Sequence, residues 1–139
     1  MRVRDLMTIH PLTVPPEMPV LEARRLMQDR FIRHLLVVEN RQLIGILTDR
    51  DIRSNMPSPA TSLSVWELNH LLARLTVREV MTSSVMVVES ERPAAAAAAL
   101  LLSEKIGALP VVDGEELVGI VTETDFVRAF AASEALTAG

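Results

Sequence analysis

Two short stretches of the sequence hold the residues best suited to binding chemistry. Thr48 and Asp51 follow an apolar run that contains Gly45, and Thr122 and Asp125 follow the same kind of run 74 positions later. An apolar run that ends in Thr-x-x-Asp predicts a strand leading into a helix. The first turn of a helix offers free backbone N–H groups and a positive dipole end, which suit phosphate. The pattern is equally typical of a capping box, in which the acid only stabilises the helix. Both interpretations stay open.

No signature of catalysis accompanies these two stretches. The sequence has no Walker loop, no G-x-G-x-x-G, no G-x-S-x-G and no H-E-x-x-H motif. Its three histidines (His10, His34 and His70) lack the spacing of metal ligands, and the absence of cysteine excludes thiol chemistry and disulfides. We therefore expect a binding protein rather than an enzyme, with no metal and no required cofactor.

Composition and charge narrow the class further. Hydrophobic residues make up 49% of the 139 residues, enough for one ordinary domain or for two small halves that share a core. No apolar run approaches the roughly 20 residues of a membrane span, and no signal-peptide core follows Met1, so we expect a cytoplasmic protein. The net charge of −4 argues against a general nucleic-acid surface.

An internal repeat organises the whole chain. A shift of 74 positions aligns residues 3–53 with 77–127 without a gap. Two copies are too few for a solenoid, so we expect a pair of halves that cover each other's hydrophobic faces. The predicted organisation is a first repeat at 1–56, a linker with a connecting helix at 57–76, a second repeat at 77–131 and a tail at 132–139.

Each repeat predicts the element order β-α-β-β-α, and hence an α+β fold. In the first copy we expect a helical turn at 3–7, a strand at 12–14, a helix from Pro19 to Arg30, strands at 34–39 and 42–47, and a helix that ends before Pro57. Asn40-Arg41 and Asp113-Gly114 are the predicted hairpin turns. The alanine run at 94–99 falls where the first helix of the second copy is expected, and predicts a tightly packed face.

The linker predicts one more helix. Ser64 and Glu67 form the pattern of a capping box ahead of leucines at helical spacing. Trp66, the single tryptophan, lies on this helix. We expect it to be buried where the two halves join; the alternative is an exposed anchor for a partner.

These motifs together resemble a tandem pair of CBS domains, also called a Bateman module. The resemblance covers residues 2–130 and rests on the openings Asp5-Leu6-Met7-Thr8 and Glu79-Val80-Met81-Thr82, on the runs 35–38 and 109–112, and on both Thr-x-x-Asp corners. The linker segment 61–69 also resembles acetoin-utilisation-type accessory proteins, without their additional C-terminal domain. The resemblance implies two β-α-β-β-α repeats related by a pseudo-twofold axis.

The resemblance also implies where a ligand would bind. In this family adenine-containing ligands occupy the two clefts between the repeats, with the corner Asp at the ribose hydroxyls and the corner Thr near phosphate. The residues of this chain that match those positions are Leu12, Thr13, Arg33, His34, Leu35, Thr48, Arg50 and Asp51 in the first repeat, and Met86, Val87, Gly107, Ala108, Leu109, Thr122 and Asp125 in the second.

The function implied is that of a non-catalytic sensor. Such a protein would bind an adenosyl ligand such as AMP, ADP or ATP and change its association with an unidentified partner protein. The alternatives are a ligand-free dimerisation scaffold and a sensor of S-adenosylmethionine or NAD. The apolar surface of the first helix and of the two corner helices predicts a homodimer.

The two repeats differ in charge around their corners. The first repeat places Arg33, His34, Arg50 and Arg53 there, whereas the second places Gly107, Ala108, Glu123, Thr124 and Val127 at the matching positions. Arginine binds phosphate oxygens bidentately and stays charged at any relevant pH. We therefore expect tighter binding of phosphorylated ligands at the first repeat, unless Arg50 and Arg53 point outward as solvated charges.

Overall fold

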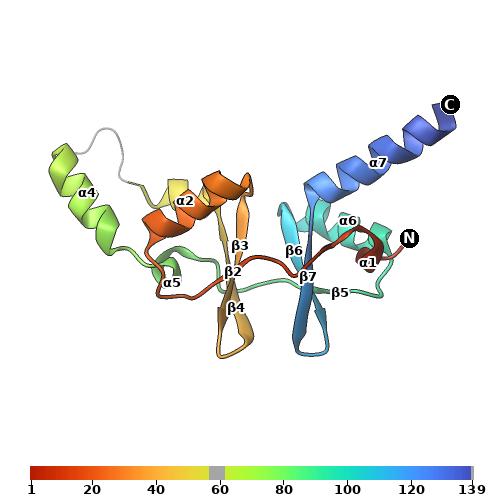
Figure 1. Cartoon of the computed structure of the whole chain (residues 1–139), viewed down its shortest axis with the longest axis horizontal. Coiled ribbons are helices and arrows are strands. Elements are labelled where there is room, and N and C mark those ends of the chain that lie inside the picture. Colours follow the sequence, from red (N-terminus) through yellow and green to blue (C-terminus); the bar gives the residue numbers. More distant parts are fainter. Residues whose placement is uncertain (57–61, 139) are drawn as a thin grey trace. The chain divides into compact units, whose positions relative to one another are not determined.

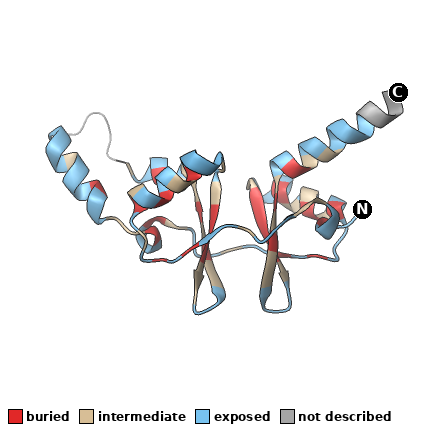
Figure 2. Cartoon of the chain, in the orientation of Figure 1, coloured by how far each residue is buried: buried red, intermediate tan, exposed pale blue. Residues whose placement is uncertain are grey.

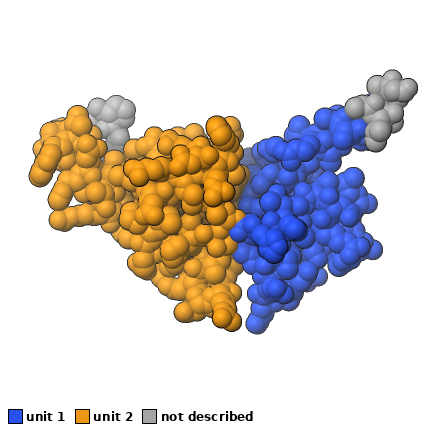
Figure 3. All heavy atoms as spheres, in the orientation of Figure 1, with its two compact units in different colours: residues 1–11, 86–139 blue, residues 12–85 orange. Residues whose placement is uncertain are grey.

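The computed structural model describes residues 1–56 and 62–138, which form two compact units (Figure 1; Figure 3). Unit 1 contains Met1–Pro11 together with Met86–Gly139, and unit 2 contains Leu12–Val85. Each unit therefore holds the body of one repeat and the opening segment of the other. Within the described residues, no helix is long and apolar enough to cross a membrane, and no group of acidic or histidine side chains could hold a metal ion.

Unit 2 is built on a three-stranded sheet with the strand order β2-β3-β4. The strands are β2 (Thr13–Val14), β3 (His34–Glu39) and β4 (Gln42–Thr48); the helices are α2 (Val20–Arg30), α3 (Asp49–Ser54), α4 (Val65–Arg74) and α5 (Val77–Val80). β2 runs parallel to β3, and β3 runs antiparallel to β4. Apolar residues of β3 and β4 bury one sheet face under α2 and α3, with Leu35, Leu47, Met27 and Ile52 in the core.

Unit 1 repeats this plan with one additional strand, in the order β1-β7-β6-β5. The strands are β1 (Thr8–Ile9), β5 (Val88–Glu89), β6 (Ala108–Asp113) and β7 (Glu116–Thr122); the helices are α1 (Val3–Leu6), α6 (Ala94–Glu104) and α7 (Glu123–Ala138). Ala97, Leu101, Leu109 and Val121 lie in its core. The alanine run thus forms a helix whose Ala94 and Ala97 pack closely, as predicted.

The opening segment of each repeat completes the sheet of the other repeat. β1 pairs antiparallel with β7, with Thr8 opposite Ile120. In unit 2 the matching residue Thr82 exchanges two backbone hydrogen bonds with Ile46, at 2.9 and 3.0 Å. The sequence does not predict β1, because a two-residue strand that pairs with a strand more than 100 residues away carries no local periodicity.

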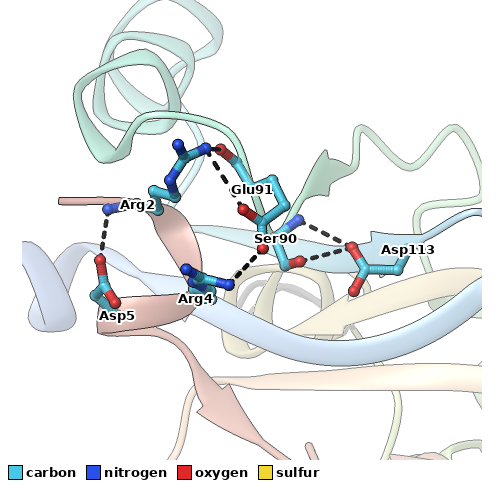
Figure 4. Close-up of polar contacts among 6 residues, drawn as sticks. All are labelled: Arg2, Arg4, Asp5, Ser90, Glu91 and Asp113. Atoms are coloured by element: carbon cyan, nitrogen blue, oxygen red, sulfur yellow. Dashed lines mark hydrogen bonds and ion pairs between the residues drawn. The ribbon is translucent and has the colours of Figure 1, made fainter.

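Polar side chains fasten these opening segments (Figure 4). In unit 1, Arg4 Nη1 donates to Glu91 Oε1 at 2.7 Å, and the buried Ser90 hydroxyl donates to Asp113 Oδ1 at 2.7 Å. Arg2, beside Arg4, also donates to the carbonyl oxygen of Glu91 at 2.7 Å. The segment after β5 is thereby held to the start of the chain on one side and to the end of β6 on the other.

Unit 2 uses one arginine for the same purpose. Arg78 of α5 donates to Glu17 and to Glu39. Its hydrogen bond to the Glu17 carboxylate is the main reason why the pKa of Arg78 is raised above its usual value, with Glu39 adding to the effect. Arg78 and Arg4 occupy matching positions of the two repeats, so the opening segments share this fastening.

The hairpin turns follow the sequence closely. Asn40 and Arg41 have φ of 52° and 65°, which matches the twist of the β3–β4 hairpin. In the β6–β7 hairpin the two-residue turn is Gly114-Glu115, one residue beyond the predicted Asp113-Gly114, because Asp113 pairs with Glu116. Gly114 supplies the positive φ of 63°.

The linker helix α4 forms with the predicted capping box of Ser64 and Glu67. The prediction that Trp66 is buried is wrong: its side chain is 73% exposed and stacks on His70 with the ring centroids 5.4 Å apart. Most residues of α4 are exposed (Figure 2). The helical period explains this, because Leu68 and Leu72 face unit 2 and turn Trp66 to the opposite side. Pro57 and Pro59, predicted to end the preceding helix, lie outside the described residues; within them, α3 ends at Ser54.

Candidate functional site

The predicted residues of the first repeat gather at one end of the sheet of unit 2. Antiparallel pairing of β3 with β4 places His34 opposite Thr48. The backbone N–H of Asp49 donates to the carbonyl oxygen of Arg33 at 3.1 Å, and Leu36 donates to Leu12 across the β2–β3 pair. Residues from three strands and from the start of α3 therefore meet at this end.

Thr48 and Asp51 form a complete capping box. Asp51 N donates to Thr48 Oγ1 and Thr48 N donates to Asp51 Oδ2, each at 3.0 Å. The Thr82 hydroxyl contacts the other carboxylate oxygen of Asp51, Oδ1, at 3.3 Å. A carboxylate has about four acceptor positions, so the half-buried Asp51 keeps acceptor capacity beyond these two bonds.

The corner of unit 1 has a different second partner. Asp125 Oδ2 accepts from Thr122 N at 2.8 Å and from the Thr122 hydroxyl at 3.2 Å. Its other oxygen, Oδ1, lies 3.4 Å from Arg128 Nη1. Asp125 is 8% exposed, so most of its carboxylate is already enclosed by the protein. The two corners share the capping bond but differ in what holds the second oxygen.

The basic residues around the unit 2 corner are exposed. Arg33, Arg50 and Arg53 all reach solvent, and Arg53 lies 3.6 Å from Asp49 on the same helix. Exposure of Arg50 and Arg53 agrees both with solvated charges and with charges that a ligand can reach, so the expected preference for phosphorylated ligands at the first repeat stays a prediction. At the unit 1 corner, Gly107 and Ala108 bring no charge.

The remaining predicted residues divide by burial. Leu35 and Leu109 are fully buried core residues, so only their main chain could contact a ligand. Leu12, Thr13, Met86 and Val87 are exposed beside β2 and β5. These four side chains are available to a ligand within their own units.

Thr82 and Arg128 were not identified from the sequence. Thr82 reaches Asp51 because the opening segment of the second repeat docks on β4, and a repeated Met-Thr at 7–8 and 81–82 was the available signal. Arg128 lies three residues after Asp125 on α7, a spacing that brings side chains together on a helix.

Comparison with known proteins defines the class to which this fold and these corners belong. The CBS domain family model matches residues 3–58 and 77–132. The chain belongs to the CBS-domain family, and it carries two copies of the domain.

Relatives share the module in different settings. The CBS domain-containing protein YhcV of Bacillus subtilis is 32% identical over 123 residues, which is 88% of this chain and 81% of YhcV. L-aspartate semialdehyde sulfurtransferase of Methanocaldococcus jannaschii is 29% identical over 132 residues, 92% of this chain but 23% of that protein. The inosine-5'-monophosphate dehydrogenase of Korarchaeum cryptofilum is 36% identical over 115 residues, which is 82% of this chain but 21% of that enzyme.

Solved structures agree with the fold. A protein described as the acetoin utilization protein AcuB of Vibrio cholerae superposes with a TM-score of 0.81 at 32% identity, covering 99% of this chain and 95% of AcuB. CBSX2 in complex with AMP gives a TM-score of 0.79 at 31% identity, covering 94% and 97%. The CBS domain pair of MJ0100, in complex with 5'-methylthioadenosine and S-adenosyl-L-methionine, gives 0.78 at 27% identity, covering 96% and 98%.

Proposed function

We propose that this chain is a non-catalytic regulatory module that binds an adenosyl ligand at its Thr-x-x-Asp corners and signals the bound state to a partner protein. The observation that carries the proposal is the pair of corner carboxylates, Asp51 and Asp125, each held at a strand end by a backbone N–H. A fixed carboxylate with remaining acceptor positions suits the two hydroxyl groups of a ribose. The adenosyl ligands of CBSX2 and of the MJ0100 pair support this ligand class.

The ligand of unit 2 is a phosphorylated nucleotide in this proposal. Arg33 and Arg50 flank the corner, and guanidinium groups bind phosphate oxygens with charge-assisted hydrogen bonds. AMP, ADP and ATP all fit this requirement.

The corner of unit 1 favours an adenosyl ligand with less negative charge. Gly107 and Ala108 replace the Arg33-His34 pair, and Glu123 would repel a phosphate. S-adenosylmethionine carries a positive charge near its sulfur, so this corner could take it where it could not hold a nucleotide. NAD is the less suitable choice for this corner, because its two phosphates would lie near Glu123 and because Arg128 is already paired with Asp125.

The module acts as a homodimer in this proposal. In unit 1, α6 and α7 pack against each other and leave Leu102, Val127 and Phe130 80%, 66% and 66% exposed. Such a group of large apolar side chains on neighbouring helices is typical of a protein interface.

Thermal unfolding with a panel of adenosyl compounds tests the ligand proposal. A compound present at 100 times its dissociation constant should raise the free energy of unfolding by about 2.7 kcal/mol. AMP, ADP, ATP and S-adenosylmethionine are the compounds to compare, with guanosine monophosphate as the control for the base. If none of them changes the unfolding midpoint, the corners serve only as helix caps and the chain is better described as a ligand-free scaffold.

A further inference from the structure

A groove between α2 and α3 of unit 2 combines an apolar wall with positive charge. Its volume is about 350 Å³, and the buried side chains of Met27 and Ile52 form part of the wall. The charged residues in the lining are Arg24, Arg33, Arg53 and Asp49. Three arginines against one acid give the lining a formal charge of +2. Arg24 and Arg33 make no side-chain hydrogen bond or ion pair with any other residue that the structure describes, so their charges are available to a partner.

The groove uses the side of α3 that faces away from the Thr48–Asp51 corner. Each residue of an α-helix is rotated by about 100° from the one before it. Asp49, Ile52 and Arg53 therefore lie on one side of α3, and Asp51 lies on the opposite side. A protein that covered the groove would leave the corner carboxylate uncovered.

The matching surface of unit 1 has lost the positive charges. The residues 74 positions after Arg24, Arg33 and Arg53 are Ala98, Gly107 and Val127. The acid is kept, because Glu123 matches Asp49. The unit 1 surface that corresponds to the groove lining therefore has a formal charge of −1.

This surface of unit 1 instead exposes large apolar side chains. Leu102 of α6 is 80% exposed, and Val127 and Phe130 of α7 are each 66% exposed. They match Gln28, Arg53 and Met56 of the groove lining in unit 2. The two repeats thus place an apolar, acidic surface and a basic groove on equivalent helices.

Charge favours contact between unlike surfaces. Two unit 2 grooves would bring +2 against +2, and two unit 1 surfaces would bring −1 against −1. Unit 1 of one copy against unit 2 of another brings −1 against +2, with Glu123 close to arginines that have no other anion. Like charges placed across an interface are costly, whereas opposite charges steer and orient association.

The side chains also suit each other. An aromatic residue that enters an apolar pocket is the usual anchor of a protein interface, and arginine is the other residue type enriched there. Phe130 would meet the thioether side chains of Met27 and Met56, which adapt to the shape of a neighbour. Guanidinium groups such as those of Arg24 and Arg53 are attracted to the face of an aromatic ring.

We propose that the homodimer forms when the Leu102–Val127–Phe130 surface of one copy enters the α2–α3 groove of a second copy. The inference rests on the proposed homodimer, and it names the two unlike surfaces that meet. A two-fold axis makes the contact twice, because each copy provides one surface of each kind.

Sedimentation equilibrium on the full chain tests the contact. The groove variant Arg24→Glu/Arg53→Glu reverses the charge of the groove, and Phe130→Arg places a cation on the unit 1 surface. The control Arg25→Glu/Arg74→Glu makes the same charge change outside the groove lining, and all five side chains are exposed. We expect the groove variant and Phe130→Arg each to raise the dimer dissociation constant at least about 30-fold, the effect of losing an interface hot spot. The control should stay within about threefold of the wild type.

An equimolar mixture of the groove variant and Phe130→Arg is the decisive sample. The mixture keeps one native contact, between unit 1 of the groove variant and unit 2 of the Phe130→Arg variant. Its second contact joins introduced charges of opposite sign. We therefore expect the dimer to return, with a dissociation constant within about tenfold of the wild-type value. Circular dichroism of each variant alone verifies that both are folded.

The outcomes separate this contact from the homodimer itself. A groove variant that remains a dimer would show that two unit 1 surfaces meet, and a Phe130→Arg variant that remains a dimer would show that unit 1 is not used. Either result, or a mixture that stays monomeric, would overturn the contact between unlike surfaces and leave the homodimer standing. A monomeric wild type would overturn the homodimer as well, and the ligand proposal would still be decided by thermal unfolding with the adenosyl compounds.

Discussion

A Cβ atom on Gly45 would lie 2.5 Å from the Sδ atom of Met81 and 3.1 Å from the carbonyl oxygen of Thr82. In unit 1 a Cβ on Gly119 would lie 2.7 Å from Met7 Sδ and 2.8 Å from the carbonyl oxygen of Thr8. The glycine of each apolar run therefore lets the opening segment of the other repeat approach the strand. The same close approach brings Thr82 to Asp51, so the contact at the unit 2 corner depends on the space that Gly45 leaves for the opening segment.

Substitution of these glycines by alanine should destabilise the fold, and Gly119→Ala should cost more than Gly45→Ala. Overpacking of this kind costs about 1–3 kcal/mol. Both Cβ atoms would meet a flexible methionine, but the backbone oxygen that cannot move aside is 2.8 Å from a Cβ on Gly119 and 3.1 Å from a Cβ on Gly45. Urea unfolding of the two variants gives the comparison. Gly114→Asn is the matched control, since a Cβ there meets no atom within 4 Å and asparagine tolerates the positive φ; a larger cost for the control would contradict the role given to close approach.

Loss of the Asp51 carboxylate should weaken AMP binding more than loss of the Asp125 carboxylate. Asp51→Ala should weaken AMP binding by about tenfold through the lost ribose contact, and more than Asp125→Ala does. The reason is that exposed arginines surround the unit 2 corner, whereas Glu123 stands near the unit 1 corner. Calorimetry with AMP measures both variants.

A control separates this loss from unfolding. Asp51→Asn keeps an oxygen for the Thr48 N–H and so preserves the cap. Equal losses of AMP affinity in the two alanine variants, or a larger loss in Asp125→Ala, would show that the arginines do not decide which corner is preferred.

The buried hydrogen bond between Ser90 and Asp113 should contribute more to stability than the exposed ion pair between Arg4 and Glu91. Ser90→Ala removes a buried hydroxyl that donates to Asp113 at 2.7 Å, and we expect a loss of about 1 kcal/mol. Arg4→Ala removes an ion pair with Glu91 whose two side chains are each 56% exposed, and should cost less than about 0.5 kcal/mol. Chemical denaturation of both variants tests the order, and a more damaging Arg4→Ala would refute it.

Dimerisation should depend on the exposed apolar side chains of α6 and α7 in unit 1, namely Leu102, Val127 and Phe130. We expect a dimer at micromolar concentration, and Phe130→Arg should shift it toward monomer because a charge would be buried without a partner. Trp66→Arg is the control, because Trp66 is at least as exposed as Phe130 but lies on α4 of unit 2. Sedimentation equilibrium distinguishes the species. A monomeric wild type would contradict the dimer. A dimer that only Trp66→Arg dissociates would place the interface on α4 instead.

The sequence by itself determined the repeat, the hairpins and the caps, because each of these is a local relationship. A capping box joins Thr48 to a residue three positions away, and a hairpin turn such as Asn40-Arg41 joins adjacent strands. Apolar runs on either side of each turn predicted the paired strands β3 and β4. The CBS-domain family followed from the same local motifs, repeated at one spacing.

Only the tertiary structure decided what lies around the corners. Thr82 reaches Asp51 across 31 positions, and Arg24 lines one groove with Arg53 although 29 positions separate them. The prediction that Trp66 is buried also failed, because the face of α4 that packs depends on what the helix contacts in unit 2. Contacts of this kind depend on how separate elements dock, and no periodicity along the chain records the docking.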